Sequence, residues 1–384
     1  MRRSLPLIVL ALLATPAAAP AATVRVEGGM LLFTGEPREA NHPTFHHRAE
    51  DELVVHDPRF PGPSVTAGAG CAQDGDNTVL CPRGGVTQAD FALGAGGGAG
   101  FAPDSLTLTE AVPVPVRVTA ADDSGARVVY LDPRPVQVLL DGVANDGPAG
   151  RGDQIGPGVD DVTTGDGDDT IRGNAAANTL TGSWGRDRIA GEGGDDTLTL
   201  ASYNDVGADA VGLETHGTDA ASCGAGHDTV YFETADRLTA DCEILVLVSD
   251  SGFGYRSTSS ADRIIADRGP ATVRGADGAD RLGAARGIGG VVLIGGAGDD
   301  RLAGNADDDR LDGGSGDDSL VGAEGADRLT GGPGRDSVSG GAGADTIFVR
   351  EGFTDTVRCG SGRDTVSADR RDRVARDCER VRRR

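Results

Sequence analysis

A nine-residue repeat constrains this chain more than any other feature of its sequence. Residues 295–348 divide into six rows: GGAGDDRLA, GNADDDRLD, GGSGDDSLV, GAEGADRLT, GGPGRDSVS and GGAGADTIF. In all six rows position one is Gly, position six is Asp and position eight is aliphatic. A period this short predicts a solenoid, in which each repeat packs only against its neighbours.

Each row has the composition of a turn followed by a short strand. Positions seven to nine place one aliphatic side chain between two residues suited to solvent, which is the alternation of a strand with one buried face. Glycines in the first six positions permit positive φ and close approach of neighbouring backbones. The sequence therefore predicts an all-β fold with one inward side chain per row.

The aspartates at position six would stack in successive turns and need a counter-charge. Carboxylates held a few ångströms apart repel each other. Calcium accepts about six to eight oxygen ligands, including carboxylates and backbone carbonyls, so it can link adjacent glycine-rich turns. A solvated acidic loop is the alternative interpretation, and six rows in phase argue against it.

These rows resemble the hemolysin-type calcium-binding nonapeptide repeat (RTX), G-G-x-G-x-D-x-U-x. The resemblance implies a parallel β-roll with two rows per coil, so that strands alternate between two facing sheets. It also implies that the cofactor is calcium, several ions per chain, held between turns by position-six carboxylates and turn carbonyls. The implied metal ligands are Asp160, Asp169, Asp187, Asp196, Asp228, Asp280, Asp300, Asp309, Asp318, Asp327, Asp336, Asp345 and Asp364.

The rows fall into two blocks, which we interpret as two rolls. In the first, residues 155–199, Asn178 replaces one aspartate and Trp184 lies in a turn. In the second, which starts with weak rows near Asp262, Val291 stands at position six of the row 286–294. Rows without the acid are expected to pack without binding metal. Trp184 is expected to cover the side of the roll, with a ligand platform as the alternative.

The cysteines are spaced in a duplicated pattern. The segment CGAGHDTVYFETADRLTADCE, from Cys223, aligns without gaps with CGSGRDTVSADRRDRVARDCE, from Cys359. Each begins as a calcium row and has a second cysteine near its end, so we expect two disulfide caps where the rolls stop, although spacing alone does not prove pairing. Zinc binding is the alternative, but the chain has no CxxC. The expected disulfides are Cys223–Cys242, Cys359–Cys378 and Cys71–Cys81.

Residues 1–22 have the organisation of a secretory signal peptide. Two arginines precede an apolar run from Leu5 to Leu13, and small residues follow, with cleavage expected after Ala19 or Ala21. The run is too short to span a bilayer, and no later stretch is long enough. Because disulfides form in oxidising compartments, the sequence predicts a secreted, extracellular protein without a membrane span.

The net charge of −24 makes nucleic acid an implausible partner. Several divalent ions would offset most of this charge. The last residues, RDCERVRRR, are basic instead; a solvated tail is expected there, with contact to an anionic surface as the alternative.

The N-terminal third, residues 23–152, carries short alternating runs such as SLTLTEAVPVPVRV that predict β-strands. We expect a degenerate β-rich or β-roll domain, followed by the first calcium roll at 153–248 and the second at 249–384, each with its cysteine cap. The segments EPREAN and LDGVANDG resemble those that precede the rolls in secreted proteins of this type from actinobacteria.

No HExxH or GxSxG motif occurs, so no enzyme is expected. His42, His46, His47 and His56 cluster in sequence; we expect a polar loop, with a transition-metal site as the alternative. The first hypothesis for function is a secreted structural or scaffold module whose folding is coupled to calcium. The alternative is a calcium-dependent adhesion protein that binds a cell surface or polysaccharide, and a calcium-stabilised hydrolase is the weakest hypothesis.

Overall fold

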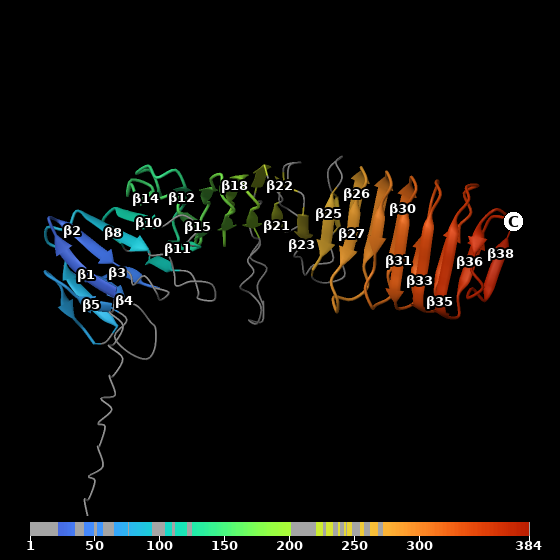
Figure 1. Ribbon diagram of the computed structural model, residues 1–384, viewed down its shortest axis with the longest axis horizontal. Helices are drawn as coiled ribbons and strands as arrows, with labels where there is room; N and C mark the ends of the chain where they lie inside the picture. The colour runs from blue at the N-terminus through green and yellow to red at the C-terminus, as the bar shows by residue number, and fades with distance from the viewer. Residues whose placement is uncertain are drawn as a thin grey trace, which may run out of the picture.

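The chain forms an elongated all-β rod with its C-terminus at one end (Figure 1). A computed structural model describes residues 22–34, 42–49, 52–56, 65–75, 77–93, 104–109, 112–120, 125–200, 220–225, 228–232, 237–238, 242, 244–247, 254–256, 262–267 and 272–383. The expected signal peptide lies outside these residues, apart from Ala22. Every regular element within them is a β-strand, and none of them forms a helix of the length and apolarity needed to cross a membrane.

From residue 159 on, successive strands alternate between two facing sheets, and neighbouring strands in each sheet are parallel. This is the predicted β-roll, with two rows per coil. One sheet contains β15 (Val159–Thr163), β17 (Thr179–Thr181), β19 (Thr197–Thr199), β21 (Thr229–Phe232), β23 (Ile244–Leu247), β25 (Arg263–Ala266), β27 (Arg281–Ala284), β29 (Arg301–Ala303), β31 (Ser319–Glu324), β33 (Ser337–Gly343), β35 (Thr356–Gly362) and β37 (Arg373–Val374).

The facing side is made of two shorter runs of strands. The first run contains β12 (Val136–Leu139), β16 (Thr170–Arg172), β18 (Arg188–Gly193), β20 (Ala220–Ala225) and β22 (Arg237–Leu238), with β13 (Gly147–Pro148) antiparallel at its edge. The second run contains β24 (Gly254–Arg256), β26 (Thr272–Asp277), β28 (Val292–Ala297), β30 (Arg310–Ser315), β32 (Arg328–Thr330), β34 (Thr346–Val349), β36 (Thr365–Ala368) and β38 (Arg380–Arg383).

The core of the roll is a stack of single aliphatic side chains. The register places position eight over position eight, as in Leu302 opposite Leu320 and Leu320 opposite Val338. These side chains are at most 1% exposed, as are Leu311, Leu329 and Ile347. Complete burial of one such side chain stabilises the fold by roughly 1.5–3 kcal/mol, so the inward position predicted for each row is confirmed.

The N-terminal third belongs to the same stack rather than to a separate fold. It opens with an antiparallel hairpin of β1 (Ala22–Glu27) and β2 (Met30–Thr34). Parallel pairing then joins β2 to β8 (Gln88–Leu93), β10 (Val116–Ala120) and β14 (Gln154–Ile155), with β5 (Val65–Ala67) beside β1. Larger side chains fill this end, where the Phe91 ring centroid lies 5.5 Å from that of Phe33.

The second N-terminal layer continues directly into the roll. The strand β3 (Thr44–Ala49) is parallel to β9 (Ser105–Thr109), which pairs with β11 (Ala126–Leu131) and so with β15. Antiparallel strands β4 (Glu52–His56), β7 (Thr78–Pro82) and β6 (Ala72–Gln73) extend its outer edge. One hydrophobic core therefore runs from Ala22 to Ala368.

The three predicted cysteine pairs form disulfides. Parallel pairing of β23 with β25 places Leu245 opposite Ile264 and carries one sheet past residue 248. The boundary that we placed between two rolls is therefore no break in this sheet. The Cys223–Cys242 disulfide lies where the first run of the facing side ends, beside β20 and β22, and Cys359–Cys378 lies beside the last coil.

The Cys359–Cys378 disulfide is expected to contribute strongly to stability. Replacing both cysteines with serine should lower the free energy of unfolding by about 3 kcal/mol, because a loop of this size loses that much chain entropy when it is closed. Urea unfolding in saturating calcium measures the change. Dithiothreitol should likewise lower the free energy of unfolding of the parent protein. Equal stability of parent and variant would contradict the expectation.

Candidate metal-binding turns

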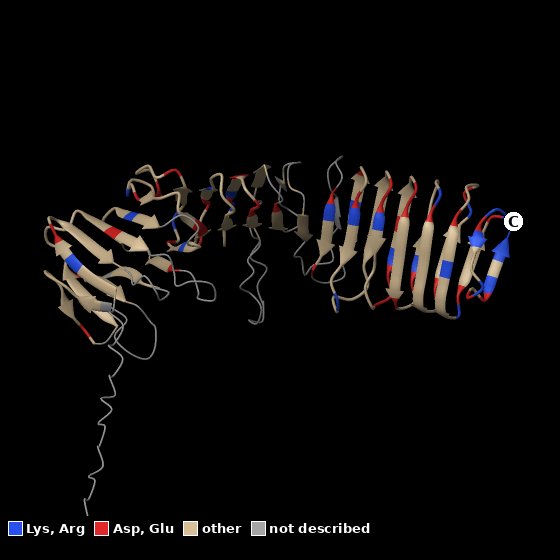
Figure 2. Ribbon diagram, viewed as in Figure 1, with Lys and Arg blue, Asp and Glu red and all other residues tan. Residues whose placement is uncertain are grey.

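Aspartate side chains line both edges of the roll, each at the end of a turn and directly before a strand. Figure 2 shows acidic residues gathered where the strands of the C-terminal half begin and end. Asp280, Asp300 and Asp318 precede strands of one sheet, while Asp327 and Asp345 precede strands of the other. These five side chains are at most 2% exposed. Position six is therefore an interior position at the edge of the roll.

One oxygen of each carboxylate is held by a hydrogen bond from the preceding coil. The backbone N–H of Asp300 donates to Oδ1 of Asp318 at 2.9 Å, and that of Asp318 donates to Oδ1 of Asp336 at 2.9 Å. On the other edge the N–H of Asp327 donates to Oδ1 of Asp345 at 3.0 Å. The aspartates thus form two hydrogen-bonded ladders along the rod.

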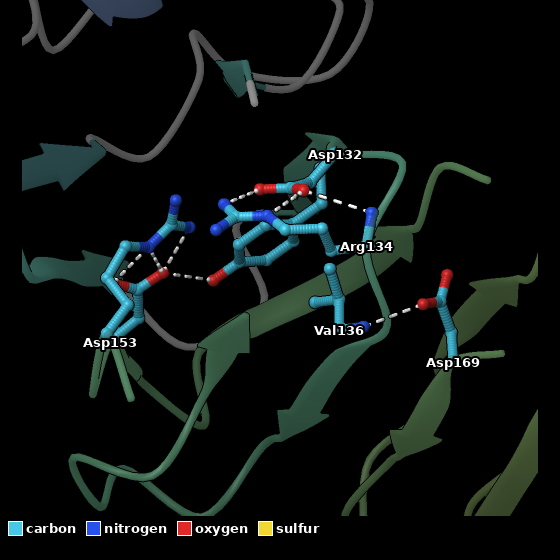
Figure 3. Close-up of polar contacts among 7 residues, drawn as sticks. Asp132, Arg134, Val136, Asp153 and Asp169 are labelled. Carbon is cyan, nitrogen blue, oxygen red and sulfur yellow. Dashed lines mark hydrogen bonds and ion pairs between the residues drawn. The ribbon is translucent and has the colours of Figure 1, made fainter. Parts of the chain in front are cut away.

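The same ladders run through the first block of rows. Figure 3 shows one beginning where the backbone N–H of Val136 donates to Oδ1 of Asp169 at 2.7 Å. The N–H of Asp169 in turn donates to Oδ1 of Asp187 at 2.9 Å. On the opposite edge the N–H of Asp196 donates to Oδ1 of Asp228 at 2.8 Å. The geometry is common to both blocks.

The second carboxylate oxygen lacks such a partner in most of these residues. It is buried and accepts no hydrogen bond, although a buried polar atom without a partner costs free energy. This holds for Oδ2 of Asp169, Asp196, Asp280, Asp300, Asp318, Asp327, Asp336, Asp345 and Asp364. The protein alone therefore accounts for one oxygen of each carboxylate and leaves the other unsatisfied.

The glycine at position one keeps the space around this oxygen open. A Cβ on Gly313 would collide with Oδ2 of Asp318 and lie 2.6 Å from the carbonyl oxygen of Gly331 in the next coil. A Cβ on Gly275 would meet Oδ2 of Asp280 and the carbonyl oxygen of Gly295 in the same way. A carboxylate oxygen and a carbonyl oxygen thus face the same small space, which only glycine leaves free.

This donor set fits a hard cation. Across the described ranges, no group of three His, Cys, Asp or Glu side chains is placed to hold a metal ion. Backbone carbonyls would therefore have to complete the coordination shell, and calcium accepts them readily alongside a carboxylate. The unpartnered Oδ2 atoms and the glycine cradle are what such a site requires.

The pKa values of several aspartates at position six are raised, which shows that negative charge is unfavourable at these turns. Burial raises the pKa of Asp318 to about 7; the hydrogen bond from the Asp300 N–H opposes this rise, and the neighbouring carboxylates of Asp336 and Asp300 add to it. Burial likewise raises the pKa of Asp327 to about 7. The charged form is therefore disfavoured in the folded chain, and a cation beside Oδ2 would offset that penalty.

Two of the sequence-predicted ligands differ from the rest. Asp160 is half-buried within β15, where the register shifts beside Ala126, and its Oδ2 accepts the N–H of Gly125 at 2.7 Å. Asp309 belongs to the ladder, but its Oδ2 accepts the N–H of Asn305 at 2.7 Å. Both carboxylates are satisfied by the protein at the oxygen that the others leave without a partner.

Sequence reasoning missed some members of the ladder, among them Asp355 and Asp372. The N–H of Asp336 donates to Oδ1 of Asp355 at 2.8 Å, and that of Asp355 donates to Oδ1 of Asp372 at 3.2 Å. Asp355 is fully buried, and its Oδ2 has no hydrogen-bond partner. Its turn contains only one glycine, Gly352, and the signal that remains is the tripeptide DTV, in which Asp355 directly precedes the first two residues of β35.

The histidine cluster does not form a metal centre within the described residues. Nδ1 of His56 is hydrogen-bonded to the hydroxyl of Thr78, with 2.9 Å between the two atoms. Among the described residues, no group of three possible metal ligands lies there. His42 and His46 are half-buried at β3, while the side chain of His47 lies outside the described part.

Comparison with protein families matches the rows. The profile of the RTX calcium-binding nonapeptide repeat (4 copies) matches residues 163–198, 292–320 and 321–354. These segments lie in the two blocks whose turns carry the unpartnered carboxylate oxygens. No curated protein matches the chain in sequence.

Proposed function

We propose that this protein, whose β-roll is built from RTX calcium-binding repeats, is a secreted scaffold that folds when it binds calcium. The observation that carries the proposal is the column of buried Oδ2 atoms without hydrogen-bond partners, from Asp280 to Asp364. At Asp280, Asp300, Asp318 and Asp327 this oxygen lies beside a position-one glycine, which also faces a carbonyl oxygen of the next coil. Burying such a column of oxygens costs free energy in the chain without metal, and bound cations would offset that cost.

Three positions of each row have different roles in stabilising a coil. Position eight supplies one aliphatic side chain, position one supplies the cradle, and position six supplies charge. Calcium bound at the turns would neutralise the stacked carboxylates and cross-link successive coils. Because the site forms only when two coils are stacked, the free energy of binding would become free energy of folding.

Removal of one carboxylate charge from the middle of the ladder tests this assignment. Asp318→Asn should remove one calcium ion per chain and raise the calcium concentration at the folding midpoint about tenfold, since an interaction with a charged group contributes roughly 1.5–3 kcal/mol. Isothermal titration calorimetry and circular dichroism give the ion count and the midpoint.

Asp312→Asn is the matched control, because Asp312 lies on the sheet at position nine rather than in a turn. It should leave both quantities unchanged. An unaltered ion count in Asp318→Asn would contradict the assignment of Asp318 as a ligand, and the absence of any calcium binding by the parent chain would overturn the proposed function.

The three disulfides support an extracellular site of action, because such bonds persist in oxidising compartments. Extracellular calcium modules use weak sites, with Kd on the order of 10⁻⁴–10⁻³ M. N-terminal sequencing of protein from the culture medium tests export, with cleavage expected after Ala19 or Ala21.

A groove beside Trp184 favours a second candidate function, calcium-dependent binding of a polysaccharide. The indole is 37% exposed, and the groove of about 640 Å³ is also lined by Thr163, Thr181 and Tyr231. An aromatic ring beside hydroxyl groups suits a sugar face.

Retention on cell-wall glycans should require calcium and be lost in Trp184→Ala. Equal retention in chelator would contradict it. We propose no enzymatic activity.

A further inference from the structure

The turn that contains Asp309 is closed by hydrogen bonds from the protein itself. Asp309 Oδ2 accepts the backbone N–H of Asn305 at 2.7 Å, whereas Oδ2 of Asp300 and Asp318 has no partner. Asn305 stands at position two of its row, where most rows from residue 275 on have Gly or Ala with positive φ, as at Gly314 and Ala323. Asn305 does not have a positive φ.

The side chain of Asn305 satisfies the carbonyl oxygens that face this turn. Its Nδ2 donates to the carbonyl oxygen of Gly289 at 2.9 Å and to that of Ala285 at 3.2 Å. Its Oδ1 accepts the N–H of Asp307 at 2.8 Å. Asn305 is only 5% exposed. One amide group therefore contacts the upstream coil in the way that a bridging cation would.

The same arrangement recurs in the first block of rows. Asn174, also at position two, donates from Nδ2 to the carbonyl oxygen of Pro157 at 3.0 Å and accepts the N–H of Ala176 at 2.7 Å. Its own N–H donates to Oδ1 of Asn178, the residue at position six, at 2.9 Å. Asn178 carries no charge, so this turn needs no cation.

A third ladder position, Asp153, is neutralised by an arginine. Its Oδ1 accepts the N–H of Val116 at 2.9 Å, which is the ladder contact, and its Oδ2 accepts the Tyr130 hydroxyl at 3.0 Å. The guanidinium of Arg151 binds both oxygens, with Nε at 2.9 Å and 2.8 Å (Asp153 in Figure 3). The Arg151 side chain is only 8% exposed. A buried cation of the protein thus occupies the place beside this carboxylate.

We propose that Asn305, Asn174 and Arg151 are internal substitutes for calcium, which close three turns of the roll without metal. The proposal rests on the proposed function, because it assigns calcium to the turns with an unpartnered Oδ2 and excludes it from these three. The Asn305 turn adjoins the row 286–294, where Val291 stands in place of aspartate. This metal-independent turn is therefore next to a row that lacks its own carboxylate.

Asn305→Gly tests the proposal, because it restores the repeat consensus at a row that keeps Asp309. The variant should bind one calcium ion more per chain than the parent, counted by calorimetry and by elemental analysis of dialysed protein. Its folding should depend more steeply on calcium concentration than that of the parent, because one more ion is taken up when it folds. Asn174→Gly combined with Asn178→Asp should likewise gain one ion.

Asn178→Asp alone is the matched control, since it leaves the Asn174 amide bound to Pro157; it should gain no ion. An unchanged ion count in Asn305→Gly, or anomalous scattering from a calcium ion beside Asp309 in the parent crystal, would overturn the inference while leaving the proposed function intact. A parent chain that binds no calcium would overturn both.

Discussion

In excess chelator, residues 272–383 are expected to lose their β-sheet circular dichroism signal and the hydrogen-exchange protection of their backbone amides. The reason lies in the side chains that each row of the coil buries. Each row buries one aliphatic side chain, yet most turns hold a buried carboxylate whose Oδ2 atom has no partner. Without a cation these carboxylates repel along both ladders, and burial adds to the penalty.

Addition of calcium should restore both signals cooperatively, because each site needs two stacked coils. Magnesium at the same concentration should restore little, since it demands a smaller octahedral shell and gives up its water reluctantly. Hydrogen exchange read by mass spectrometry locates the change along the chain. Full protection in chelator would show that the aliphatic stack holds the roll by itself.

The region around β8 to β11 serves as the internal reference in this experiment. Its core contains Phe91, whose ring centroid lies 5.5 Å from that of Phe33 and 5.2 Å from that of Phe45. The buried carboxylate of Asp153 is paired with Arg151 there. These strands should therefore stay protected in chelator, so that unfolding is confined to the part that needs the metal.

The consensus rows were predictable from sequence because three independent requirements coincide in them. Position one must lack a Cβ, position six must carry a carboxylate and position eight must be apolar. Where the glycine of position one is missing, as in the row of Asp355, the structure still continues the ladder. Asp355 was missed because its turn has few glycines, although its carboxylate has the same backbone contact as its neighbours.

Two other features depend on contacts that a single row does not reveal. The sheet continues from β23 to β25 because Leu245 meets Ile264 across a long, weakly patterned segment. The difference between Asp309 and Asp318 comes from Asn305, which reaches the carbonyl oxygens of a turn in another coil. Sequence shows that asparagine replaces glycine there; only the fold shows which oxygens its amide contacts.

Replacement of Gly322 by alanine is expected to abolish one calcium site and destabilise the roll. Gly322 stands at position one and has an ordinary φ, so backbone strain is not the reason. The new Cβ would collide with Oδ2 of Asp327 and lie 2.5 Å from the carbonyl oxygen of Gly340. It would fill the space that the cation needs and push apart two of its ligands.

The expected loss is one ion per chain together with about 1–3 kcal/mol from overpacking, measured by calorimetry and by urea unfolding in calcium. Gly283→Ala is the matched control, because a Cβ at Gly283 meets no heavy atom within 4 Å and the residue does not have positive φ. That control should keep every ion and gain roughly 0.4–1 kcal/mol through a less flexible unfolded chain. If Gly322→Ala binds calcium with the parent's stoichiometry and affinity, Oδ2 of Asp327 is not a ligand, because its approach to the shared space would then be irrelevant to binding.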